Sequence, residues 1–217
     1  MVTFPHREAE QMRLEFPSPP PAAWYEERKW PACWTTLGDL RGLQVLDLGC
    51  LTGWLGWLAK ESGAHVVLTD IFETAAHPGL PFVPAQKEDL PFADETFDLV
   101  LTGNVLHHGD LAATCREAWR VLKPGGRLFS VQEPVIPEWK TEEQELAEFC
   151  AAELANGLEE HRYHARQYEA ALSCFHSTRV WKSHGNPMLP GAHNFESTGW
   201  PWLKSYHGGV ACSGEKR

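Results

Sequence analysis

Apolar and polar positions alternate in blocks along residues 43–135, and the blocks predict strands and helices in turn. The apolar run LQVLDLG ends at Gly49, and GWLGWLAKES then places Leu55 and Leu58 at helical spacing before Gly63. The next apolar run, AHVVLTDI, completes a β-α-β unit. A connection that contains a helix implies parallel strands and a right-handed crossover.

The same alternation continues to residue 135. LPFVPAQKEDLPFA predicts a short strand and a loop, FDLVLTGNVLHH a buried strand with a polar exit, and LAATCREAWRVLK an amphipathic helix that PGG ends. GRLFSVQEP predicts a fifth strand. This order is typical of an α/β protein with a doubly wound, Rossmann-like sheet in three layers, α/β/α.

The flanking segments read differently and divide the chain into three parts. Residues 1–42 form an N-terminal extension in which the prolines of FPSPPP precede a short lid helix. The core spans 43–183, with a helical insertion at about 138–173 and a strand candidate in STRVWKSH. Residues 184–217 form an irregular C-terminal segment, where WPWLKSY is the candidate for one last strand.

Charge and composition exclude several classes of partner. The formal net charge is -10, which argues against a nucleic acid, because phosphate binding requires clustered positive charge. No apolar stretch is long enough to cross a membrane and the N-terminus is charged, so we expect a cytoplasmic protein without a membrane partner. Six cysteines without C-x-x-C spacing predict reduced thiols. Eleven histidines show no H-E-x-x-H spacing, so we expect pocket or surface histidines and no metal site.

Asp47 separates two classes of cofactor that such a sheet binds at the carboxyl ends of its strands. A pyrophosphate gains from the N–H groups of a helix N-terminus and is repelled by a carboxylate beside it. A sulfonium and an ammonium group gain from the same carboxylate, so Asp47 favours S-adenosylmethionine over a dinucleotide. Asp70, at the end of the second strand, suits the ribose hydroxyls of either cofactor, and its alternative role is that of an exposed capping residue.

Four motifs in order carry a resemblance to a known family: VLDLGCLTGWLGWLAKESGAHVVLTDI, KEDLPFADETFDLV, VLHH and EAWRVLKPGGRLF. They resemble the class I S-adenosylmethionine-dependent methyltransferases, in particular the small-molecule type 11 methyltransferase domain. The resemblance covers about residues 43–135 continuously and the helices to about 182 more loosely. It implies about seven strands in the order 3-2-1-4-5-7-6, the last antiparallel, with helical lid segments.

The resemblance also implies roles for individual residues. The first motif lines the methionine end of the cofactor, the acid after the second strand binds the ribose, a D-L pair lies beside the adenine, and the exit of the fourth strand lies under the methionine. The cofactor-binding residues implied in this way are Asp47, Gly49, Cys50, Gly53, Asp70, Ile71, Asp89, Leu90, Thr102 and Gly103.

Leu51 departs from the D-x-G-x-G-x-G pattern of the family, which has glycine at this position. If the position requires a positive φ, or a close approach of the cofactor to the backbone, leucine strains or blocks the site. If it points away toward the lid, leucine is an apolar contact. The retained Asp47, Asp70 and Asp89 favour a functional site.

Methyl transfer to oxygen or nitrogen also requires removal of a proton, for which histidine is the commonest base. His107 and His108 are the best placed candidates, and a structural role in the loop is the alternative. Further candidates for the acceptor site or the lid are Tyr25, Arg28, Trp34, Glu133, His161 and His164, although tryptophans here equally suit packing of a short helix on the sheet.

These observations predict an S-adenosylmethionine-dependent methyltransferase that acts on an oxygen, ahead of nitrogen or carbon, of a small-molecule acceptor. A non-catalytic relative that binds cofactor or a partner is an alternative, favoured by Leu51 and by the segment 184–217. An NAD(P)-dependent oxidoreductase is disfavoured by Asp47 and by the lack of a G-x-G-x-x-G pattern. The sequence does not indicate an oligomeric state.

Overall fold

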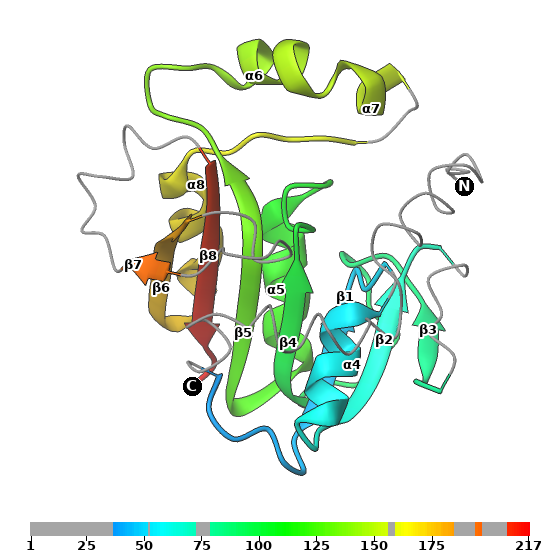
Figure 1. Cartoon of the computed structure of the whole chain (residues 1–217). Coiled ribbons are helices and arrows are strands. Elements are labelled where there is room, and N and C mark those ends of the chain that lie inside the picture. Colours follow the sequence, from blue (N-terminus) through cyan, green and yellow to red (C-terminus); the bar gives the residue numbers. More distant parts are fainter. Residues whose placement is uncertain (1–36, 52, 73–78, 156–158, 185–193, 197–207) are drawn as a thin grey trace.

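The computed structural model describes residues 37–51, 53–72, 79–155, 159–184, 194–196 and 208–217. Over these residues one mixed sheet is covered by helices on both faces (Figure 1). The predicted lid residues Tyr25, Arg28 and Trp34 lie outside the described part of the chain.

The first half of the chain forms the parallel part of the sheet. Its elements are β1 (Gln44–Leu48), α4 (Trp54–Glu61), β2 (His65–Asp70), β3 (Phe82–Pro84), β4 (Phe97–Gly103), α5 (Leu111–Val121) and β5 (Leu122–Val135). β1 pairs in parallel with β2 and β4, β2 with β3, and β4 with β5. The predicted β-α-β unit is therefore present as β1-α4-β2.

The second half adds further helices and the antiparallel part of the sheet. Its elements are α6 (Glu142–Phe149), α7 (Ala151–Ala155), α8 (Ala165–Ala171), the 3-10 helix η2 (Leu172–Cys174), β6 (His176–His184), β7 (Asn194–Glu196) and β8 (Gly208–Glu215). β8 lies between β5 and β6 and is antiparallel to both.

The strand order is β3-β2-β1-β4-β5-β8-β6-β7. The predicted order is confirmed when β8 is counted as the seventh strand, and the three residues of β7 add one short strand at the edge beyond β6. The last strand was expected in WPWLKSY, which lies outside the described residues; β8 follows that segment in the chain.

The turn between α5 and β5 differs in detail from the prediction. α5 ends at Val121 and β5 begins at once with Leu122, so Lys123–Gly126 lies within the strand. Phe97 pairs with Leu122 but Leu99 pairs with Arg127, which makes this segment a bulge rather than a separate turn. Gly125 has a φ of 78°, which explains a glycine at this point.

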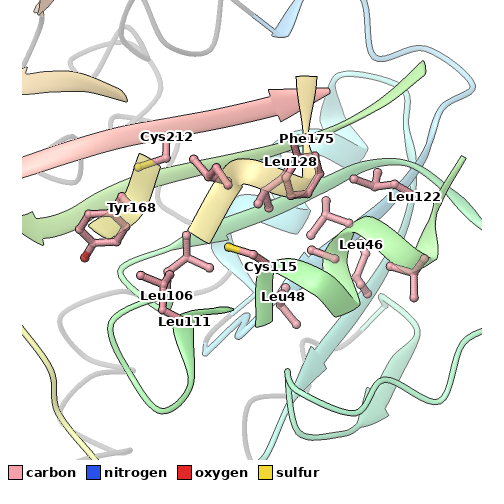
Figure 2. Close-up of a cluster of buried hydrophobic side chains, with 14 of the residues drawn as sticks. Leu46, Leu48, Leu106, Leu111, Cys115, Leu122, Leu128, Tyr168, Phe175 and Cys212 are labelled. Atoms are coloured by element: carbon pink, nitrogen blue, oxygen red, sulfur yellow. The ribbon is translucent and has the colours of Figure 1, made fainter. Parts of the chain in front are cut away.

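Two buried clusters fill the spaces on the two faces of the sheet. Under α4, Leu99 and Leu101 pack with Val45 and Phe129. On the other face, beneath α5 and α8, the second cluster includes Leu46, Leu128, Cys115 and Tyr168 (Figure 2). Because side chains alternate along each strand, every central strand contributes to both clusters.

The carboxyl ends of β4 and β5 point toward α6 and α7, which lie above this end of the sheet in Figure 1. This edge is where a doubly wound sheet binds its ligand. Among the described residues, none of the helices has the length and apolar character of a transmembrane span.

Candidate active site

The loop after β1 follows an unusual backbone path at three alternate positions. Gly49, Leu51 and Gly53 have φ values of 68°, 48° and 72°, so all three lie in the left-handed region. A leucine is strained there, which confirms that the position normally held by glycine requires a positive φ. The side chain of Leu51 is half-buried.

Gly49 is held closely against the loop that follows β4. A Cβ at this position would lie 2.6 Å from both γ-carbons of Val105, so only glycine fits. The N–H groups of Gly49 and Cys50 both donate to the carbonyl of Thr69, at 2.8 and 3.0 Å. The loop is thereby fixed between the ends of β2 and β4.

Asp47 is a buried carboxylate at the N-terminus of α4. Its side chain is 1% exposed, and its Oδ2 accepts the N–H of Gly56, in the first turn of the helix, at 2.7 Å. Burial raises the pKa of Asp47 to about 7, and the charge of Asp70 adds to the rise. The anion-binding end of α4 is thus already occupied by a carboxylate, which leaves it unsuited to a pyrophosphate.

Asp70 ends β2 and ties the glycine loop to that strand. Its Oδ2 accepts the N–H of Leu51 at 2.9 Å and its Oδ1 accepts the N–H of Phe72 at 3.1 Å. It is only 9% exposed, so the alternative of an exposed capping residue is wrong. Burial raises its pKa against the opposing effect of these hydrogen bonds. Ile71, next in the chain, is 53% exposed, an apolar side chain at the rim of the site.

Asp89 and Leu90 are placed differently from each other. Asp89 is exposed, whereas Leu90 is buried in the core and donates its N–H to Glu117 Oε2 at 3.0 Å. The carbonyl of Leu90 accepts from Arg120 at 2.9 Å. Sequence reasoning missed this pair, although Glu117 and Arg120 stand three apart on the amphipathic helix α5.

Three further predicted residues lie near the ends of β1 and β4. The hydroxyl of Thr102 is buried and has no hydrogen-bond partner among the described residues. Gly103 lies close to Leu55, since a Cβ here would be 2.9 Å from Leu55 Cδ1 and that side chain would have to move. Cys50 is buried, and burial raises the pKa of its thiol, which makes it unsuited to nucleophilic chemistry.

His107 and Glu133 form a buried pair at the ends of β4 and β5. His107 Nδ1 lies 3.1 Å from Glu133 Oε2, and Glu133 Oε1 accepts the hydroxyl of Ser130 at 2.6 Å and the N–H of Val105 at 3.1 Å. Burial alone would raise the pKa of Glu133, but His107 and these donors hold it below its ordinary value. Glu133 is therefore a charged acceptor that orients the imidazole of His107.

Glu160 closes the other side of the two histidines. Its Oε2 lies 3.6 Å from His107 Nε2, and its Oε1 lies 3.2 Å from His108 Nδ1. Arg162 donates to Oε2 at 2.7 Å. The pKa of His108 is lowered by burial and by the neighbouring His107. Glu160 and Arg162 were not among the predicted site residues, because no local spacing relates them to His107.

The two predicted histidines of the helical insertion have different roles. His161 places Nδ1 2.9 Å from Glu142 Oε1, and its backbone N–H donates to the carbonyl of His107 at 3.0 Å, which fixes the insertion to the exit of β4. His164 precedes α8 as its N-cap residue, with Nδ1 3.2 Å from the carbonyl of Ile136. His161 thus borders the histidine pair, whereas His164 caps a helix.

Part of the chain is similar in sequence to known proteins. Residues 46–130 match the family model described as "Methyltransferase domain". The demethylmenaquinone methyltransferase of Corynebacterium kroppenstedtii is 40% identical over 109 residues, which are 46% of this chain and 47% of that protein. The chain spans about half the length of the curated relatives it matches.

Solved structures extend the likeness over more of the chain. An S-adenosylmethionine dependent methyltransferase from Mesorhizobium loti matches with a TM-score of 0.60 and 21% identity, over 87% of this chain and 98% of that one. Geranyl diphosphate C-methyltransferase from Streptomyces coelicolor matches with a TM-score of 0.63 and 13% identity, over 85% and 78%. At identities this low, the two matches show a common fold and nothing more.

The fold is that of a Rossmann-like α/β protein. The resemblance to class I methyltransferases of type 11 is confirmed over residues 46–130, which match the model of a methyltransferase domain; that family uses S-adenosylmethionine as its cofactor. The residues present fit that cofactor. Asp47 and Asp70 are buried carboxylates whose pKa is raised by burial, and the hydroxyl of Thr102 is a buried polar group without a partner in the described part of the chain.

Proposed function

We propose that this protein is an S-adenosylmethionine-dependent methyltransferase that methylates a small molecule. The observation that carries the proposal is the pair of buried carboxylates, Asp47 and Asp70, at the adjacent carboxyl ends of β1 and β2, each with a raised pKa. Buried carboxylates of this kind are stabilised by a ligand that brings hydrogen-bond donors and positive charge. Cys50, Cys115, Cys174 and Cys212 are free thiols, which suits the predicted cytoplasmic location.

On the cofactor side, each implied residue has a specific task. Asp70 receives the two ribose hydroxyls while it holds the loop through Leu51, and Asp47 faces the ammonium end. Ile71 offers an exposed apolar surface for the adenine, and Asp89 is the exposed acceptor for its amine. Leu90 keeps its N–H on Glu117, so its contribution is packing under the ring.

When bound, the cofactor supplies an electrophilic methyl group on a sulfonium. The chain then has to orient the acceptor in line with that methyl and receive its proton. His107 is oriented by Glu133 so that Nε2 is turned away from Glu133 and toward Glu160. An imidazole oriented by a carboxylate is suited to accept a proton from a hydroxyl, and we therefore propose oxygen as the acceptor atom, ahead of nitrogen or carbon.

A carbon acceptor is the second candidate, because the names of similar proteins point to acceptors that are not hydroxyl groups. The curated relatives are named for demethylmenaquinone, and one structural neighbour is a geranyl diphosphate C-methyltransferase. Demethylmenaquinone is therefore the first acceptor to assay, followed by small phenols and hydroxy acids for the oxygen hypothesis.

Calorimetry with S-adenosylmethionine and its demethylated product tests the cofactor site directly. We expect a dissociation constant between about 1 µM and 1 mM, and a loss of about 10-fold to 100-fold in Asp47→Asn and in Asp70→Asn, as expected for hydrogen bonds to charged groups. Asp98→Asn is the matched control, because Asp98 pairs with Lys123 and with the N–H of Gln44 at the first residue of β1, the amino end of the sheet.

Three results would count against the proposal or part of it. The absence of heat and of a thermal shift at millimolar ligand would exclude a cofactor site. If neither Asp47→Asn nor Asp70→Asn weakened cofactor binding, the cofactor site would not lie at the ends of β1 and β2. Tight binding without turnover over the whole acceptor panel would favour the non-catalytic alternative.

A further inference from the structure

The histidine cluster at the exit of β4 has the geometry of a metal site. One ligand atom each from His107, His108 and Glu160 can be chosen so that all three lie within 4.8 Å of one another. The N to O distances are 3.6 Å from His107 Nε2 to Glu160 Oε2 and 3.2 Å from His108 Nδ1 to Glu160 Oε1, so each histidine faces a different oxygen of the carboxylate. A divalent ion with bonds of about 2.1 Å in tetrahedral geometry separates its ligands by about 3.4 Å, which lies between these two values.

The hydrogen bonding of His107 leaves the appropriate nitrogen for a metal. Glu133 can only accept, so Nδ1 of His107 carries the proton and Nε2 has a lone pair on the side of Glu160. A carboxylate that accepts from the far nitrogen of a ligand histidine is the usual outer partner in metal sites. In a neutral imidazole with Nδ1 protonated, Nε2 and the oxygen of Glu160 are both acceptors, and either a proton or a metal ion between them makes the contact favourable.

The charge of the surroundings also favours a cation. Two carboxylates, Glu133 and Glu160, are 0% and 7% exposed, and Arg162 is the guanidinium paired with Glu160. With neutral imidazoles this buried group has a net negative charge. The carbonyl oxygen of Glu159 can only accept and lies 3.2 Å from His108 Nδ1, so this nitrogen is the donor in the metal-free chain and a metal ion would displace its proton.

We propose that His107, His108 and Glu160 bind a divalent transition metal ion of the zinc type. Two imidazoles and one carboxylate are the ligand set of open zinc sites, in which a water or a substrate oxygen takes the fourth position. Mg²⁺ and Ca²⁺ prefer oxygen ligands and are not expected here. Neither the H-E-x-x-H pattern nor any other local motif is needed, because the ligands come from the exit of β4 and from the insertion before α8.

The metal site does not depend on the proposed methyl transfer. Under that proposal the ion would lie beside the loop of Val105, which packs on Gly49 of the cofactor loop. It would then lower the pKa of a coordinated acceptor hydroxyl, so that the proton would pass to solvent water and His107 would serve as a ligand and not as the base. The acceptor class implied is a small molecule with an ionisable oxygen.

The test uses the full chain without a histidine tag, stripped with a chelator and titrated with Zn²⁺ by calorimetry, with retained zinc measured by mass spectrometry. We expect one Zn²⁺ per chain. His108→Ala and Glu160→Gln should each weaken binding roughly 100-fold or more, and Glu133→Gln about 10-fold to 100-fold through the orientation of His107. Circular dichroism checks that each variant is folded.

His161→Ala is the matched control, because His161 belongs to the same segment and lies between the surface carboxylates of Glu142 and Glu159. It should bind Zn²⁺ as the unaltered chain does. Substitution by Co²⁺ should give weak visible bands without a thiolate charge-transfer band, which separates this site from cysteine ligation. Absence of stoichiometric zinc, unchanged affinity in both ligand variants, or an equal loss in the control would overturn the metal site. Calorimetry with the demethylated cofactor on the same samples reports separately on the proposed function.

Discussion

Leu51 is the residue at which sequence and backbone conflict most directly. Its φ of 48° lies in the region that glycine occupies freely, and its N–H is held by Asp70 Oδ2 at 2.9 Å. The hydrogen bond and the flanking positive φ values of Gly49 and Gly53 keep the backbone in this conformation. The loop therefore retains the path of a glycine loop despite the leucine, with strain of roughly 1–2 kcal/mol.

A pair of substitutions at position 51 isolates that strain. We expect Leu51→Gly to be more stable than Leu51→Ala by about 1 kcal/mol, because alanine keeps the left-handed cost and glycine does not. Denaturant unfolding measures the difference. At Lys60, on the exposed face of α4, the order should be reversed, with alanine more stable than glycine by about 0.5–1 kcal/mol. If alanine were more stable than glycine at position 51 as well, Leu51 would be unstrained.

Asp47 predicts a pH dependence of cofactor binding. Its pKa of about 7 means that the carboxylate loses its charge as pH falls through neutrality, and with it the attraction for the ammonium end of the ligand. We expect affinity to weaken about tenfold from pH 8 to pH 6, and Asp47→Asn to be weaker at all pH values with a flat profile. Calorimetry at three pH values measures this. If the affinity of Asp47→Asn fell with pH as steeply as that of the unaltered chain, another group would be responsible, and Asp70 would be the first candidate.

The pH dependence of folding stability is opposite to that of cofactor binding: through Asp47, a lower pH weakens binding but favours the folded state. The folded pKa of Asp47 is raised from 3.8, so the folded state holds this proton more tightly than the unfolded chain does. Its contribution to stability is fully present below about pH 4 and is lost as pH rises toward 7. A ligand cation offsets that loss, which links cofactor and stability in the same pH window.

At the scale of elements, the site depends on the contact between the loops after β1 and β4. Gly49→Ala should destabilise the fold by about 2–4 kcal/mol, from the contact with Val105 and from the positive φ. Val105→Ala relieves the contact with the new Cβ but leaves the cost of the positive φ at position 49. In a double-mutant cycle we expect the pair to be less destabilised than the sum of the single variants by about 1 kcal/mol or more. Additive values would show that the two loops are not in contact.

Some parts of the site were readable from the sequence and others were not. The spacing of Asp47, Gly49 and Gly53 is local, and the apolar run that ends at Asp70 fixes that acid at the edge of the sheet. Glu160 was missed because it meets His107 across 53 positions, and only folding of the insertion brings the two together. Residue types identify a candidate there, but only tertiary contacts identify its partners.

At the scale of the whole molecule, the sheet was predictable because the alternation of strand and helix persists over five strands. The position of the last strand was not. β8 reads GGVACSGE, which lacks the bulky apolar run typical of a buried strand, because Phe175 fills the space above Gly214. Small residues are required at that crowded position, and they remove the signal on which strand prediction depends.

Removal of residues 208–217 should abolish cooperative unfolding. β8 pairs with β5 on one side and with β6 on the other, and Cys212 is fully buried, so its loss leaves one edge each of β5 and β6 unpaired and opens the core. Thermal unfolding followed by circular dichroism is the measurement. Deletion of Arg217 alone is the control: it is exposed, and Lys216 keeps its backbone bonds to Gly125 and Gly126. A folded core without β8 would contradict the central role of this strand.

The position of β8 in the sheet also sets the order in which the protein can form. β5 ends at Val135 and its partner begins only at Gly208, so a ribosome that adds about 5–20 residues per second completes β8 roughly 4–15 s after β5. During that interval β5 is an edge strand with unpaired backbone groups, open to pairing with another nascent chain. The yield of folded protein should therefore depend on translation speed and chaperones through this one late strand.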